Sequence, residues 1–147
     1  MTDKKFVVWV DDDRLLLSLS ITALKEESID VLSIDNVKDA YKFIKNDPQK
    51  IAGIIIDVMM DPGELLADRA TRHGLETGYR FADYLSEQDL LKETSLFFLT
   101  NASFTGEVYR TADGEKEIPR FKKSKYESDE LVDLVIEQFG LNDNEKR

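Results

Sequence analysis

Apolar residues are distributed along the chain in two alternating patterns. Short apolar runs predict strands, and between them apolar residues recur at helical spacing, which predicts amphipathic helices. The runs that predict strands are residues 6–10, 29–34, 51–56, 95–99 and 118–123. Residues 6–10 and 51–56 do not alternate with polar ones and are rich in β-branched side chains, which is typical of strands covered on both faces. Trp9, Phe97 and Phe98 lie inside such runs and are expected in the core.

Most stretches between the predicted strands, and the stretch after the last one, carry an apolar stripe at helical spacing. The stripes that predict helices are Leu17, Ile21 and Leu24; Val37, Ala40, Tyr41 and Ile44; Phe81, Tyr84 and Leu85; and Val132, Val135, Ile136 and Phe139. Asn36 and Ser128 are expected to cap the second and the last of these helices, and Gly140 to end the last. Residues 104–112 are weakly patterned and are interpreted as a further helix, followed by a turn at residues 113–114. Strands that alternate with helices predict a three-layer α/β sandwich with right-handed crossovers.

Carboxylates directly follow two of the predicted strands. Asp11 and Asp12 come after residues 6–10, and Asp57 comes after residues 51–56. In a parallel sheet the ligand crevice lies at the carboxyl ends of the strands. If the two strands are neighbours, the three aspartates converge on a small acidic pocket, whose repulsion a divalent cation would relieve. Magnesium suits this pocket, with Asp12 and Asp57 as direct ligands and Asp11 acting through water.

Phosphoryl chemistry would use further residues at strand ends. Asp57 is a candidate nucleophile, since a carboxylate that attacks a phosphoryl group forms an acyl phosphate. Thr100 follows the fourth predicted strand and can donate a hydroxyl hydrogen bond to a phosphoryl oxygen. Lys122 or Lys123, at the end of the last strand, can supply a positive charge to the same group.

Composition narrows the classes of function. The 147 residues, 41% of them hydrophobic, are enough for one buried core and too few for two ordinary domains. The net charge of -10 argues against a nucleic-acid partner, which would need a basic face. The absence of cysteine excludes disulfides and thiolate metal sites. No run reaches roughly 18 apolar residues and no signal-peptide pattern is present, so we expect no membrane partner and a cytoplasmic location.

Four segments at strand ends, taken in order, resemble the receiver domain of bacterial two-component response regulators, of the chemotaxis-regulator type. They are residues 7–13, 54–60, 97–102 and 118–124. The resemblance covers nearly the whole chain and implies a flavodoxin-like fold, with a five-stranded parallel sheet in the order 2-1-3-4-5 and helices on both faces. Residues 1–140 would form the receiver domain and residues 141–147 a flexible tail.

The resemblance also implies the chemistry. A sensor histidine kinase or histidine phosphotransfer protein donates a phosphoryl group to Asp57, with Mg2+ required and Mn2+ as a substitute. Thr100 is the switch hydroxyl, and Lys123 is the phosphate-binding lysine. The implied metal ligands are Asp11, Asp12, Asp57 and the backbone carbonyl of Met59.

The implied function is signalling through protein binding, without a turnover substrate, so the chain is not expected to be an enzyme in the usual sense. Phosphorylation would shift a pre-existing equilibrium and change the surface built by the fourth helix and the fifth strand, where a downstream protein binds. Because the chain ends soon after its last helix, we expect a stand-alone regulator. One alternative is a pseudo-receiver that acts as a phosphorylation-independent protein-binding module. Another is a magnesium-dependent phosphatase or phosphotransferase on a different α/β fold.

One departure from the family pattern is an insertion beside Asp57. It adds about a dozen residues, Asp61 through His73, before the loop glycine Gly78. Loops of this length are usually functional lids or disordered segments, and we weigh partner contact or a lid equally against simple disorder. The only histidine, His73, is expected to be exposed and is given no role.

The other departures lie near the ends of the last two strands. Asn101 stands where the family usually has a small residue, and Arg120 stands where a switch aromatic is common. Ser124 replaces the usual proline, which leaves the lysine register open between Lys122 and Lys123. The residues that lead into Lys123 favour that lysine.

Overall fold

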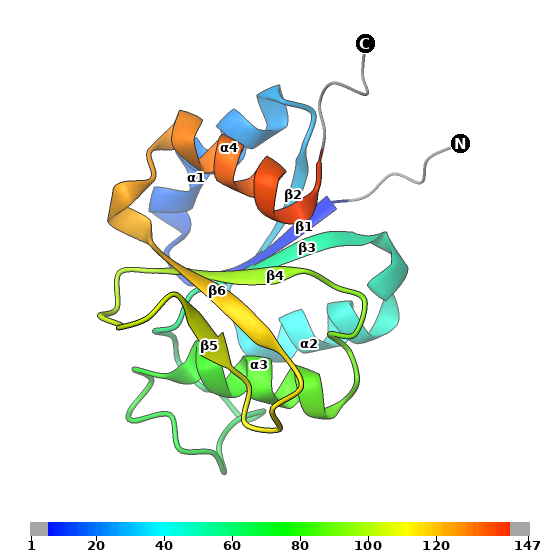
Figure 1. The fold of residues 1–147 in the computed structure, drawn as a ribbon, viewed down its shortest axis with the longest axis vertical. Helices are drawn as coiled ribbons and strands as arrows, with labels where there is room; N and C mark the ends of the chain where they lie inside the picture. Colours follow the sequence, from blue (N-terminus) through cyan, green and yellow to red (C-terminus); the bar gives the residue numbers. More distant parts are fainter. Residues whose placement is uncertain (1–5, 142–147) are drawn as a thin grey trace.

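The computed structural model describes residues 6–141, and the rest of the predicted tail, from residue 142, lies outside them. The main elements, shown in Figure 1, are β1 (Phe6–Val10), α1 (Arg14–Glu26), β2 (Asp30–Ile34), α2 (Val37–Asn46), β3 (Ile51–Ile56), α3 (Thr77–Glu87), β4 (Leu96–Thr100), β5 (Val108–Arg110), β6 (Glu117–Lys122) and α4 (Ser128–Phe139). Short 3-10 helices, Pro48–Lys50 and Lys123–Lys125, precede β3 and follow β6. All five predicted strands are confirmed to within one residue at each end.

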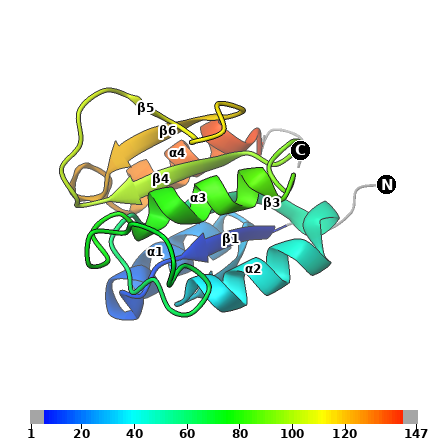
Figure 2. The same ribbon diagram turned by 90° about the horizontal axis from the view of Figure 1, so that it is seen from below.

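The sheet has six strands in the order β2-β1-β3-β4-β6-β5. The first five strands in this order are parallel, and β5 is antiparallel to β6. Figures 1 and 2 show α2 and α3 on one face of the sheet and α1 and α4 on the other. The flavodoxin-like α/β fold and its parallel strand order are therefore confirmed, and the number of strands is six instead of the predicted five.

Each face of the sheet has its own hydrophobic core, because successive residues of a strand point to opposite faces. Val8 and Phe98 pack in the core beneath α2 and α3. Trp9 and Phe97 pack in the core beneath α1 and α4. Trp9 is 1% exposed and both phenylalanines are 0% exposed, so their prediction as core residues is confirmed.

Two of the three helix ends predicted from the sequence are confirmed. Asn36 caps α2, and its side chain accepts the N–H of Asp39 at 2.8 Å. Gly140 ends α4 in the left-handed conformation, with φ of 65°. Ser128 is not the cap of α4: that position belongs to Glu127, whose N–H donates to Glu130 Oε1 at 3.1 Å. No helix in the described part of the chain is long and apolar enough to cross a membrane.

Residues 104–112 do not form the predicted helix. They contain β5, which pairs with β6 in a hairpin, with Tyr109 opposite Ile118. Val108 and Arg110 are exposed, and Tyr109 between them is partly buried. This alternation has the period of a strand, and it turns the tyrosine inward, where its ring stacks on Tyr79 at 4.5 Å between centroids. The predicted partner surface therefore has a hairpin in place of its fourth helix.

The hairpin is attached to α3 by a buried polar cluster. The Tyr109 hydroxyl donates to the Asp83 carboxylate at 3.0 Å, and the N–H of Ala112 donates to the same carboxylate at 2.8 Å. Arg80 donates to the Tyr109 oxygen at 3.1 Å. Asp83 is 2% exposed, and burial together with its charge raises the pKa of Tyr109. A buried carboxylate is tolerated here because these donors surround it.

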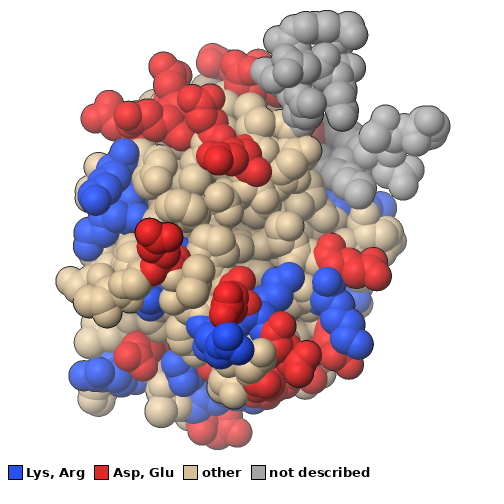
Figure 3. Space-filling model, viewed as in Figure 1, with Lys and Arg blue, Asp and Glu red and all other residues tan. Residues whose placement is uncertain are grey.

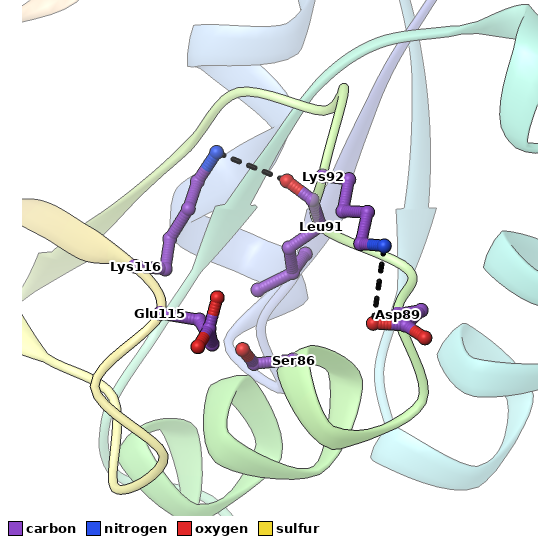
Figure 4. A pocket seen from close by; sticks show the side chains of 6 residues that line it. All are labelled: Ser86, Asp89, Leu91, Lys92, Glu115 and Lys116. Carbon is purple, nitrogen blue, oxygen red and sulfur yellow. Dashed lines mark hydrogen bonds and ion pairs between the residues drawn. The ribbon is translucent and has the colours of Figure 1, made fainter.

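A second attachment joins the hairpin turn to the far end of α3. Lys116 donates to the carbonyl of Leu91 at 3.0 Å, and Ser86 donates to Asp113 at 2.9 Å. Figure 4 shows Lys116 reaching the Leu91 carbonyl at a pocket of about 200 Å³, with Ser86 and Glu115 below this contact. The hairpin is thus attached to α3 and the segment that follows it by two sets of hydrogen bonds.

The buried attachment should matter far more to stability than an exposed ion pair in the same hairpin. We expect Tyr109→Phe to lower the free energy of unfolding by about 1–3 kcal/mol, because it removes a donor from the buried Asp83 carboxylate. Arg110→Ala removes an ion pair with Glu117 whose partners are 63% and 54% exposed, and should cost less than about 1 kcal/mol. Urea denaturation of both variants measures the difference. Equal losses would show that the Asp83 cluster does not hold the hairpin.

Candidate functional site

The structure brings together the three aspartates that the sequence places at strand ends. β1 and β3 are parallel neighbours in which Val10 lies opposite Ile56, so Asp11 and Asp57 emerge side by side. One carboxylate oxygen from each of Asp11, Asp12 and Asp57 lies within 4.8 Å of the other two. Asp11 is 0% exposed and Asp57 is 6% exposed. Two of the three carboxylates are therefore largely shielded from water.

A lysine contacts this cluster, and the interatomic distances distinguish Lys123 from Lys122. The Nζ atom of Lys123 lies 2.7 Å from Asp11 Oδ2 and 3.4 Å from Asp57 Oδ2. Lys122 instead donates to the backbone carbonyls of Asn101 at 2.8 Å and Ala102 at 3.3 Å. Of the two, only Lys123 lies at the carboxylates.

Burial and charge set the protonation of the site. Burial and the neighbouring charge of Asp57 raise the pKa of Asp11 to about 6, although Lys123 opposes the shift. Burial and Asp57 also raise the pKa of Asp12. Burial lowers the pKa of Lys123, but its contacts with Asp11 and Asp57 outweigh that effect, so the net shift is upward and the side chain stays cationic. At neutral pH, three carboxylates face one ammonium, which favours a bound cation.

The backbone around Met59 is held by the segment that returns from the insertion. The Val58 carbonyl accepts the N–H of Gly78 at 2.8 Å, and the N–H of Met60 donates to the Gly74 carbonyl at 3.1 Å. The Met60 carbonyl accepts the hydroxyl of Thr77, which is fully buried. Among the described residues, no donor lies on the Met59 carbonyl itself. This carbonyl is therefore available to a cation beside Asp57.

The insertion is a folded loop, so simple disorder is the wrong alternative. Leu66 is 1% exposed and joins the core beneath α2 and α3. Arg69 donates twice to Glu87 of α3, at 2.8 and 3.1 Å, and stacks on the ring of Tyr84. Figure 2 shows the loop at the edge of the sheet toward which the β1 and β4 arrows point. His73 is exposed, as expected.

Two of the sequence departures contact each other. The Asn101 side-chain oxygen accepts the backbone N–H of Ser124 at 3.0 Å. Proline at position 124 would have no N–H to donate, so Asn101 and Ser124 form a matched pair. Thr100, the residue before Asn101, is fully buried at the end of β4, and its hydroxyl oxygen accepts the N–H of Ala102 at 3.1 Å.

Arg120 occupies aromatic surroundings. Its guanidinium lies 5.1 Å from the ring centroid of Phe104 and 5.8 Å from that of Tyr79. It also donates to the Thr105 carbonyl and to the Tyr79 hydroxyl, the latter at 3.3 Å. A cation over aromatic rings thus stands where an aromatic side chain was expected.

Sequence reasoning missed the polar residues of α3 that organise this region. Asp83, Arg80 and Thr77 look like ordinary solvent-facing helix residues, because their partners lie in segments far along the chain. The alternation of exposed and partly buried residues in β5 is visible only in the structure, because Val108 and Tyr109 are both apolar and give no period-two signal in the sequence.

No protein-family model matches the chain, and no curated protein sequence matches it significantly. Solved structures do match. The receiver domain of the Francisella response regulator 1452 superposes with a TM-score of 0.66 at 21% identity, over 93% of this chain and 98% of that one. The chain has a receiver-domain fold. A putative response regulator from Chloroflexus aurantiacus gives 0.66 at 19% identity, over 94% and 99% of the two chains. The BeF3-activated DrrB receiver domain gives 0.61 at 17% identity, over 95% and 100%.

Within this receiver fold, Gly78 allows α3 to approach the candidate site closely. A Cβ at this position would lie 2.4 Å from the Asp57 carbonyl oxygen and 2.7 Å from the Val58 Cα. We expect Gly78→Ala to lower the free energy of unfolding by about 3 kcal/mol, because backbone atoms cannot yield as a side chain would. Gly63→Ala is the control: nothing lies within 4 Å, and only the left-handed φ of 60° opposes the substitution, at about 1 kcal/mol. Equal losses in urea denaturation would contradict the close approach.

The shifted pKa of Asp11 should be visible in the metal-free protein. Carboxyl 13C NMR is expected to show Asp11 titrating near pH 6. Because the folded pKa lies above the unfolded one, folding is coupled to proton uptake, and this group's contribution lowers the free energy of unfolding as pH rises from about 4 to about 6. Lys123→Met should raise the midpoint further, because the lysine holds it down. A midpoint at 3.8, the ordinary pKa of an aspartate, in the unmodified protein would contradict the burial of Asp11.

Proposed function

We propose that the protein is a phospho-acceptor signalling domain in which Asp57 receives a phosphoryl group from a histidine. The observation that carries the proposal is the Lys123 ammonium, which lies within 3.4 Å of both Asp11 and Asp57 at the tips of three parallel strands. A carboxylate nucleophile, a fixed cation and an acidic pair are the groups that this transfer requires. The donor would be a sensor histidine kinase or a histidine phosphotransfer protein in the cytoplasm.

The transfer can be written in terms of the chain's own groups. An Asp57 carboxylate oxygen attacks the phosphorus, the bond from phosphorus to the donor's imidazole nitrogen breaks, and that nitrogen keeps the electron pair. Lys123 exchanges its contact with Asp57 for one with a phosphoryl oxygen. The Thr100 hydroxyl, now an acceptor for Ala102, would donate to another phosphoryl oxygen. The product is one acyl phosphate per chain.

The acidic cluster fits magnesium. Asp11, Asp12, Asp57 and the Met59 carbonyl are hard oxygen donors, the type that Mg2+ and its substitute Mn2+ prefer. Magnesium, when bound, neutralises the carboxylates and the charge of the phosphoryl group. The structural similarity to a receiver domain in its BeF3-activated form supports a phosphoryl site at the same strand ends.

The proposed output is altered protein binding at the β5–β6 hairpin. This surface takes the place of the predicted face of helix and strand, since β5 occupies the region of that helix. The hairpin follows β4 along the chain after the connecting residues 101–107, and its strand β6 carries Arg120. Elsewhere, the exposed residues Asp129, Glu130, Asp133 and Glu137 make α4 acidic. Figure 3 shows acidic side chains along the top of the face where α4 lies, which suits basic protein partners rather than nucleic acid.

A phosphorylation-independent binding module is the second candidate. The contacts of Arg120 with Thr105 and Tyr79, and the bond between Asn101 and Ser124, favour it because they tie down the segment that a switch would have to move. In that case the hairpin would bind its partner without any modification of Asp57.

Intact-mass spectrometry after incubation with acetyl phosphate and Mg2+ tests the proposal. We expect the mass of one phosphoryl group to be added, and to be absent from Asp57→Asn and from samples without magnesium. Lys123→Met should slow the addition about 100-fold, the usual effect of losing one charge-stabilising group. Lys122→Met is the matched control and should react like the unmodified protein, because Lys122 contacts only backbone carbonyls in the described part of the chain.

Failure of the unmodified protein to react with acetyl phosphate and with a panel of histidine kinases would reject phosphotransfer and leave the binding module. Repeated turnover on a phosphorylated small molecule would instead indicate an enzyme.

A further inference from the structure

The segment that returns from the insertion, residues 74–78, holds the peptide unit that would supply a backbone ligand to the cation. The Met59 carbonyl and the Met60 N–H belong to one planar peptide unit, and all described peptide bonds are trans, so the oxygen and the hydrogen point in opposite directions. The Met60 N–H donates to the Gly74 carbonyl at 3.1 Å. An acceptor on the N–H side of the unit therefore sets the direction of the carbonyl on its other side.

The peptide units on either side of this one are held as well. The hydroxyl of Thr77, which is 0% exposed, donates to the Met60 carbonyl. The N–H of Gly78 donates to the Val58 carbonyl at 2.8 Å. Because both neighbouring carbonyls are fixed by donors from the same returning segment, the carbonyl of Met59 has little freedom to turn.

Gly74 can approach Met60 only because it has no side chain. Its φ is 89°, and a Cβ at this position would lie 2.9 Å from the Met60 carbonyl oxygen. Arg72 and His73 before it also have positive φ, of 55° and 60°, although they carry side chains. Such a backbone is unfavourable for residues other than glycine, and it persists where the surrounding structure holds it. Leu66, buried in the core, anchors the loop that makes this return.

We infer that the insertion is a support for the cation site: through Gly74 and Thr77 it fixes the orientation of the Met59 carbonyl, so that this oxygen is already placed to act as a ligand. Gly74 and Thr77 are positioning residues, because they act through the backbone of residues 59 and 60. The inference rests on the cation site proposed above. It gives the insertion a task that the other parts of the site do not require.

The two common divalent cations distinguish this role from a general effect on folding. Partners that orient a metal ligand typically change metal affinity by about 10–100-fold. Mg2+ demands near-ideal octahedral geometry, whereas Ca2+ accepts a flexible arrangement of oxygens. Loss of the orientation should therefore weaken the binding of Mg2+ more than that of Ca2+, and partial unfolding would weaken both by the same factor.

Isothermal titration calorimetry with Mg2+ and with Ca2+ measures this difference. Thr77→Val keeps the shape of the side chain without the hydroxyl, and should weaken Mg2+ binding about tenfold and Ca2+ binding by a smaller factor. Thr77→Ser keeps the hydroxyl and should retain the Mg2+ affinity of the unmodified protein.

A second pair of variants tests the Gly74 carbonyl independently. Gly74→Ala pushes a Cβ against the Met60 carbonyl, and should also weaken Mg2+ binding about tenfold, again with a smaller effect on Ca2+. Gly63→Ala is the matched control, because Gly63 lies in the same loop with a φ of 60° and has no atom within 4 Å of the added Cβ. This variant should bind both cations like the unmodified protein.

NMR spectroscopy of a 13C,15N-labelled sample observes the Met59 carbonyl carbon directly, through the Met60 amide. We expect its signal to shift when Mg2+ binds to the unmodified protein. If the unmodified protein binds no Mg2+, the cation site is rejected and the inference with it. If Mg2+ binds but the Met59 signal does not move, the inference alone is overturned. Unchanged Mg2+ affinity in Thr77→Val and Gly74→Ala, or equal losses for the two cations, would likewise overturn it and leave the cation site standing.

Discussion

The ion pairs of Lys123 with Asp11 and Asp57 are the interaction on which the rest of the site depends. They join the ends of β1, β3 and β6, whose residues are 112 and 66 positions apart along the chain. Two buried carboxylates in contact would otherwise repel each other without compensation, and breaking a buried pair by removing one partner is strongly destabilising. The lysine therefore holds the strand tips together and is the group that a phosphoryl ligand would recruit.

Helix α3 links this site to the two unusual segments of the protein. On one side it holds the folded insertion, through Arg69 and Glu87. On the other it holds the β5–β6 hairpin, through Asp83 and Tyr109. Buried residues consequently occur nearly all round the helix, including polar ones such as Thr77, Asp83 and Ser86. Gly78 places the start of α3 against the backbone of Asp57. Helix α3 therefore connects both segments to the candidate site.

Two of the departures from the receiver pattern, Asn101 and Ser124, depend on each other, and the third, Arg120, has partners of its own. Asn101 and Ser124 bind each other across the ends of β4 and β6, and replace the rigidity of a proline with a hydrogen bond. Arg120 lies among aromatic side chains of α3 and of the segment after β4. Replacing Ser124 with proline would remove the N–H that Asn101 accepts, so these two positions depend on each other.

The sequence by itself determined the five parallel strands, two of the three predicted helix ends and the aspartates at the strand tips. These follow from local chemistry, because apolar runs, caps and turn residues act within a few positions of themselves. The sequence favoured Lys123 over Lys122, and the tertiary structure shows the ion pairs that Lys123 makes with the carboxylates. Only the tertiary structure decided that residues 108–110 form a strand and that the insertion is folded. Each of these outcomes depends on a partner far away in the chain, such as Asp11 for Lys123 or Asp83 for Tyr109, and no local periodicity encodes such a partner.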